Sequence, residues 1–158
     1  MKFTDFDPES IQIGKYANRK ISLGDVSFQI PRMYMPFGIS GFTPNMGPTS
    51  YNIDFSMNGW NEDGNYVKTF HTFLKHIEDV IIDHISDISD EIFGENKTPE
   101  ELREMFNSNI KTSANYDPKF RVKVNTISDS NRIKPDIFDV NNDEITCEVS
   151  NNLFSKYS

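Results

Sequence analysis

Residues 119 to 124, KFRVKV, alternate three cations with three apolar side chains. Lys119, Arg121 and Lys123 would share one face of a β-strand, because successive side chains of a strand point to opposite faces. Further cations and aromatic rings lie in or near expected loops: Arg19, Lys20, Arg32, Tyr34, Phe37, Phe42 and Trp60. Single-stranded nucleic acid is held by a cationic groove with exposed rings on which bases stack. These residue types predict a site for such a polyanion.

The same residues also have a purely structural interpretation. Charged side chains on an edge strand prevent unwanted pairing with other chains. Basic faces turned to solvent are common on antiparallel strands, and aromatic loop residues can close the ends of a core. The residues alone leave both interpretations open.

All three histidines, His71, His76 and His84, fall within one predicted helix. His76, Asp79 and Asp83 have the spacing of one helix face, but a metal site would also need ligands from a second element. An acidic helix produces such combinations by chance. We therefore expect no metal site here.

Two other motifs point only weakly to chemistry. The segment DVNNDEITCEVS, which begins at Asp139, has Glu144 where a calcium loop needs glycine and Ser150 where it needs a bidentate glutamate, so it predicts a polar turn. Cys147 is the single thiol and has no histidine nearby in the sequence. We expect neither catalysis nor a cofactor.

Composition narrows the class of protein. The 158 residues fit one domain, and they contain no apolar run of about 20 residues that could span a bilayer. The single cysteine and the absence of a secretory signal in MKFTDFDPES fit a reducing compartment. The net charge of −8 arises from residues 61–105, which carry 12 acidic and 4 basic residues. An overall acidic chain can thus still present a basic surface elsewhere.

The periodicity predicts strands on either side of a helical region. Residues 51–57 alternate as a half-buried strand, and residues 21–30 predict two short strands or one bulged strand. A long amphipathic helix ends at Gly94, and a shorter one begins after Thr98 with a capping box. The remaining predicted segments are a loop at 32–48, a strand at 119–124, a strand within 133–143 that runs into a polar turn, and a last strand at 145–149.

This order predicts a mainly β or α+β fold in a single domain, 1–158. Residues 1–20 would form an N-terminal arm, and residues 66–106 a helical insertion between strands. An OB-type antiparallel barrel fits the length and the pattern. A two-layer α+β sandwich fits nearly as well.

Several motifs, in order, resemble a known family. IPRMYMPFGIS at 30–40, the strand YNIDFSM, the helix ending in DEIFGENKTPEELREMF and the run YDPKFRVKVNT at 116–126 resemble the single-stranded DNA-binding proteins of large nucleocytoplasmic DNA viruses. That family is similar to the single-stranded DNA-binding protein of short-tailed phages, an OB barrel with a long helix between strands. The likeness covers residues 20–143.

The resemblance implies sequence-independent binding of single-stranded DNA during viral DNA replication or recombination in the host cytoplasm. Lys119, Arg121 and Lys123 would contact phosphates, with Arg32 and Tyr34 adding to the groove. The predicted site comprises Arg19, Lys20, Arg32, Tyr34, Phe37, Trp60, Lys119, Arg121 and Lys123. A homo-oligomer and viral replication or virion proteins are further expected partners, and a membrane is not.

The chain departs from the phage proteins at its end, SNNLFSKYS, where they carry an acidic tail. A second hypothesis is therefore a non-catalytic virion structural or protein-interaction protein derived from the same fold. It predicts a homo-oligomer that buries Met33, Met35, Phe37 and Phe42.

Overall fold

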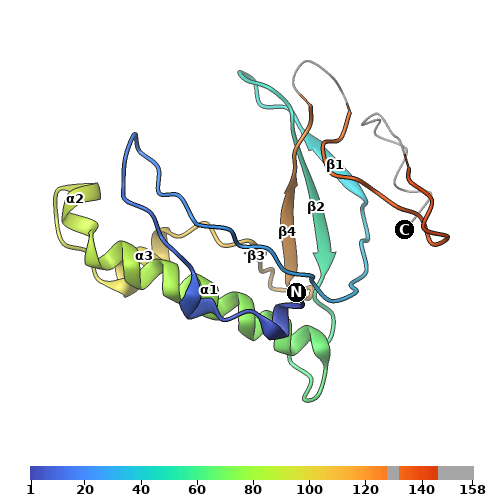
Figure 1. The fold of residues 1–158 in the computed structure, drawn as a ribbon, viewed down its shortest axis with the longest axis horizontal. Coiled ribbons are helices and arrows are strands. Elements are labelled where there is room, and N and C mark those ends of the chain that lie inside the picture. Colours follow the sequence, from blue (N-terminus) through green and yellow to red (C-terminus); the bar gives the residue numbers. More distant parts are fainter. Residues whose placement is uncertain (128–131, 146–158) are drawn as a thin grey trace. The chain divides into compact units, whose positions relative to one another are not determined.

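A computed structural model describes residues 1–127 and 132–145 and shows an α+β fold. Its elements are the 3₁₀ turns η1 (Phe3–Asp5) and η2 (Pro8–Ser10), the strands β1 (Ile39–Phe42) and β2 (Ser50–Ser56), the helices α1 (Tyr66–Asp87), α2 (Ser89–Phe93) and α3 (Pro99–Met105), and the strands β3 (Ile110–Lys111) and β4 (Lys119–Val124) (Figure 1). The helices thus follow β2 and precede β3 along the chain, at the place predicted for a helical insertion.

The contacts divide the chain into two compact units. The helical unit comprises Met1–Arg32 and Gly59–Ser108, and the sheet unit comprises Met33–Asn58 together with the described part of Asn109–Ser158. The predicted N-terminal arm and the helical insertion belong to the same unit. The prediction of one domain over 1–158 stays a prediction.

The sheet unit contains a four-stranded antiparallel sheet in the order β1-β2-β4-β3. The strands predicted at 51–57 and 119–124 are both present, as β2 and β4, and all of β4 pairs with residues 51–56 of β2 (Figure 1). Ile39 and Val124 are buried on one face, where Tyr51, Ile53, Ile133 and Ile137 pack against them. The apolar half of each alternation therefore forms the core of this unit.

In the helical unit, residues predicted as one long helix form two. Asn65 caps α1 by accepting a hydrogen bond from the Val67 amide at 2.9 Å, and the helix stops at Asp87. The hydroxyl of buried Ser89 donates to the Ser86 carbonyl at 2.8 Å, which is the kind of side-chain bond that competes with the helical backbone ladder. After this break α2 runs to Gly94, whose φ of 76° ends it as predicted.

The N-terminal arm is held to α1 by a cluster of phenylalanine rings. Phe73 lies at its centre, with ring centroids 5.4 Å from Phe3, 6.2 Å from Phe6 and 5.0 Å from Phe28. Phe3 is buried and also contacts Phe70 at 5.1 Å. An arm that contains two short 3₁₀ turns is thereby fixed by aromatic packing.

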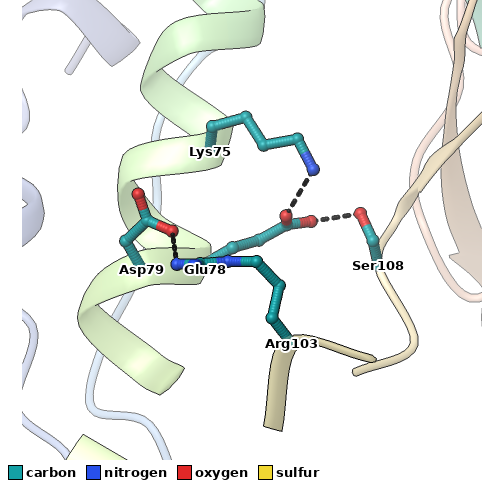
Figure 2. Close-up of polar contacts among 5 residues, drawn as sticks. All are labelled: Lys75, Glu78, Asp79, Arg103 and Ser108. Atoms are coloured by element: carbon teal, nitrogen blue, oxygen red, sulfur yellow. Dashed lines mark hydrogen bonds and ion pairs between the residues drawn. The ribbon is translucent and has the colours of Figure 1, made fainter. Parts of the chain in front are cut away.

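Helix α3 begins with the capping box that the sequence predicts. The Thr98 hydroxyl accepts from the Glu101 amide at 3.2 Å, and the Glu101 carboxylate accepts from the Thr98 amide at 2.8 Å. Arg103 of α3 then donates to Asp79 of α1 at 2.5 Å, so an ion pair joins the two helices (Figure 2).

Beside that ion pair, Glu78 of α1 has two partners. Its carboxylate accepts a hydrogen bond from Lys75 at 2.9 Å on one oxygen and from the Ser108 hydroxyl on the other (Figure 2). The Ser108 contact attaches the residues that follow α3 to α1. Carboxylates of the acidic helix are thus partly neutralised by contacts within the helical unit.

The α+β class is confirmed, whereas the predicted barrel is not found in the described residues and three predicted segments differ from the structure. The described residues do not close into an OB-type barrel, because β1 and β3 lie at opposite edges of the sheet. Residues 21–30 form no strand and make only single bridges, Lys2 to Gln29 and Ile13 to Leu23. Within 133–143, Ile133 and Phe138 make only isolated bridges, to Thr126 and Glu144. The strand predicted at 145–149 lies, apart from Ile145, outside the described residues. Residues 39–42, predicted as loop, form β1.

Candidate nucleic-acid interface

The three cations of KFRVKV lie on one face of the sheet. Lys119, Arg121 and Lys123 stand directly opposite Ser56, Asp54 and Asn52 of β2, respectively. Residues opposite each other in an antiparallel pair share a face. The other face carries the apolar partners Val122 and Ile53, so the polar and apolar faces separate as the alternation predicts. Successive cations are about 7 Å apart along β4.

A fourth cation joins this face through β3. Lys111 stands directly opposite Lys119 in the β3–β4 pair. Like charges at opposite positions of a sheet are destabilising, so this arrangement favours an anionic partner. Lys111 is not predicted from the sequence, because a strand of two residues shows no alternation that could reveal its face.

One carboxylate lies among these cations. Asp54 accepts from Arg121 Nε at 2.7 Å and from Nη2 at 2.8 Å, a bidentate pair in which the Asp54 side chain is 15% exposed and that of Arg121 45%. The hydrogen bond from Arg121 is the main cause that lowers the Asp54 pKa, and the charges of Lys119 and Lys111 lower it further. Asp54 therefore experiences a positive field.

The four strands together contain four cations and this single carboxylate. Because all five charges lie on the same face, that face carries a net charge of about +3 at neutral pH. The protein as a whole has a net charge of −8. We call this set of residues, Lys111, Lys119, Arg121, Lys123 and Asp54, the basic face.

Exposed aromatic rings flank the basic face. Lys119 Nζ lies 4.7 Å from the centre of the Phe37 ring, a cation–π contact. The Tyr34 carbonyl accepts from the Ser56 amide at 2.7 Å, which ties that segment to the end of β2. Phe42 of β1 pairs with Ser50 and so lies on the same face at the far end of the sheet. Tyr34, Phe37 and Phe42 are 63%, 60% and 66% exposed.

The other predicted site residues belong to the helical unit. Arg19 and Lys20 are exposed at a tight turn in which Ala17 and Lys20 exchange backbone hydrogen bonds of 3.0 Å. Arg32 is also exposed. Trp60 is half-buried, with its ring 5.1 Å from that of His71, so part of its surface is used in packing against α1. The structure thus groups five of the nine predicted residues, Tyr34, Phe37, Lys119, Arg121 and Lys123, in the sheet unit.

Two of the three side chains considered for metal binding, His76 and Asp79, have other partners. His76 Nε2 lies 2.8 Å from Glu9 Oε1, and Asp79 is paired with Arg103. In residues 1–127 and 132–145 no cluster of three or more histidine, cysteine, aspartate or glutamate side chains is arranged to hold a metal ion. Cys147 lies outside the described residues.

Residues 139–143 form a turn, as predicted for the segment that begins at Asp139. One oxygen of the Asp139 carboxylate accepts from the backbone amides of Asn141 at 2.8 Å and Asp143 at 2.9 Å. The hydrogen bond from the Asp143 amide is the main cause that lowers the pKa of Asp139. The carboxylate therefore serves to shape the turn.

Comparison of the chain with models of protein families, with characterised proteins and with solved structures gave no match. Among the described helices, none combines the length and the apolar character needed to cross a membrane.

Proposed function

We propose that the protein binds single-stranded DNA without sequence preference on the basic face of its sheet unit. The observation that carries this proposal is the excess of cations there, with Lys111 placed directly opposite Lys119. Phosphates would relieve that repulsion, and the resulting contacts would carry no base information. Bases would stack on Tyr34, Phe37 or Phe42, each stack contributing about 1 to 3 kcal/mol.

A relation to OB-fold proteins is part of the same proposal. The chain order of strands, a long helix and further strands supports it, whereas closure into a barrel is not found in the described residues. A role in viral DNA replication or recombination, in the host cytoplasm, rests on the sequence resemblance and stays a prediction.

Titration of a labelled oligo-dT by fluorescence anisotropy, from about 50 mM salt upward, tests the proposal. If four phosphates are neutralised, the logarithm of the association constant should fall with the logarithm of salt concentration with a slope of about −3. Lys119→Glu with Lys123→Glu should abolish the binding, because two attractive charges become repulsive.

The matched control is Lys15→Glu with Lys68→Glu, which changes the net charge equally but lies in the helical unit. It should bind as the wild type does, and circular dichroism should show both variants folded. Absence of a salt-dependent interaction in the wild type, or equal loss in both double variants, would contradict the proposal.

The exposed rings favour a second candidate function, protein interaction. Phe37 and Phe42 are exposed as an apolar interface would need, whereas Met33 and Met35 are already half-buried. β1, which carries Phe42, is an edge strand of the sheet. This function predicts a homo-oligomer in light scattering that Phe42→Ser dissociates. A monomer at all concentrations would count against it.

A further inference from the structure

The helical unit contains a pocket of about 370 Å³ between the N-terminal arm, the residues before Met33 and the start of α1. Backbone hydrogen bonds form its wall: the Phe3 amide donates to the Gln29 carbonyl at 3.1 Å, and the Gln29 amide donates to the Met1 carbonyl at 2.8 Å. Tyr66, the first residue of α1, also lines the pocket. The pocket is thus built from three separate segments that pack together.

Two cations line this pocket, Lys2 and Arg32. Both are exposed, and within residues 1–127 and 132–145 neither forms an ion pair. The described lining contains no acidic residue. The pocket lining therefore carries two positive charges that pair with no carboxylate among the described residues.

Aromatic and apolar side chains also line the pocket. The Tyr66 ring is 61% exposed and contacts buried Phe3 edge to face at 6.1 Å, so Phe3 fixes it in place while much of its surface stays open. Ile30 and Pro31 add apolar surface. The side-chain amide of Gln29 and the hydroxyl of Thr4, which donates to the Asp5 carboxylate at 3.3 Å, also line the pocket.

We propose that this pocket binds one nucleotide, with its phosphate between Lys2 and Arg32 and its base against Tyr66. The volume lies within the range of about 300 to 1,000 Å³ that small-molecule sites have. An apolar ligand would leave both cations unsatisfied, and inorganic phosphate would leave the ring surface bare. A ligand that joins an anion to a planar ring can contact both the two cations and the Tyr66 ring.

A free nucleoside monophosphate and the 5′-phosphorylated end of a strand present the same chemistry. Isothermal titration calorimetry with AMP, adenosine, inorganic phosphate and short oligo-dT with and without a 5′ phosphate distinguishes these sources. AMP or the phosphorylated oligonucleotide should bind at least tenfold more tightly than adenosine, inorganic phosphate or the unphosphorylated strand. Binding of AMP identifies a free nucleotide site, and binding of the phosphorylated strand alone identifies a strand-end site.

The variants use an affinity tag at the C-terminal end, because Lys2 lines the pocket. Lys2→Ala with Arg32→Ala should weaken binding of the phosphorylated ligand at least tenfold, and Lys15→Ala should leave it unchanged. Tyr66→Ala should weaken the binding of AMP and leave the weaker binding of inorganic phosphate unaltered. All three changes affect exposed side chains, so thermal unfolding should confirm that the protein stays folded.

This proposal is independent of the basic face, and one variant separates the two. Lys119→Glu with Lys123→Glu should abolish binding of long oligo-dT and leave AMP binding intact. The nucleotide pocket is refuted if neither AMP nor the phosphorylated strand binds at millimolar concentration. It is refuted equally if binding is indifferent to the change at Lys2 and Arg32.

Discussion

Replacing Asp54 with asparagine should have opposite effects on stability and on binding of single-stranded DNA. Asp54→Asn removes the charge of the bidentate pair and keeps one oxygen that can accept from Arg121. Both side chains lie at the sheet surface, so screening by solvent limits how much the ion pair contributes to the free energy of unfolding. We expect the free energy of unfolding to fall by about 1 kcal/mol.

The same change should strengthen DNA binding. It raises the net charge of the basic face by one and frees the Arg121 guanidinium for a phosphate. Affinity for oligo-dT should rise about fivefold, equivalent to about 1 kcal/mol. The slope of the logarithm of the association constant against the logarithm of salt concentration should become steeper by about 0.7.

Anisotropy titrations at three or more salt concentrations, combined with urea unfolding, measure both effects. Asp136→Asn is the matched control, because it removes an exposed charge from the same unit outside the four strands. It should alter the affinity less than Asp54→Asn does. If Asp54→Asn leaves the affinity and the salt dependence unchanged while stability falls, Arg121 does not contact the DNA and the reasoning is refuted.

Three further predictions concern stability. Because the pKa of Asp54 is lowered in the folded protein, its pair with Arg121 stabilises the folded state at pH values above the unfolded pKa of about 4, and this contribution is lost as the pH falls through the folded pKa. The difference in unfolding free energy between wild type and Asp54→Asn should therefore shrink in acid. A difference that stays constant with pH would contradict this prediction. Ser89→Ala should lower the free energy of unfolding, measured in urea, by about 1 to 3 kcal/mol, because the Lys97 amide then loses the buried hydroxyl that accepts its hydrogen bond at 2.8 Å. Ser86→Ala removes a less buried hydroxyl and should lower it by less. Gly41→Val should lower the melting temperature, because even a Cβ at that position would lie 3.0 Å from the Tyr51 ring, and an unchanged melting temperature would show that the ring moves freely.

Local signals in the sequence predicted several elements because neighbouring residues alone determine them. The capping box at Thr98, the left-handed Gly94 and the Asp139 turn depend on side chains within a few residues of each other. The alternation in 51–57 and 119–124 likewise reports which side chains of a strand can be buried together. β1 escaped prediction because its four residues, which include Gly41, acquire strand geometry only by pairing with β2.

The sequence by itself determined that Lys119, Arg121 and Lys123 share one face of a strand, since the period of two is a property of the extended backbone. Only the tertiary structure decided what stands opposite them. The register of β4 against its neighbours placed Asp54 on Arg121 and Lys111 on Lys119, pairs separated by 67 residues and by 8 residues in the chain. Such a register depends on packing of the opposite, apolar face, and a shift by one residue would reverse which side chains reach solvent.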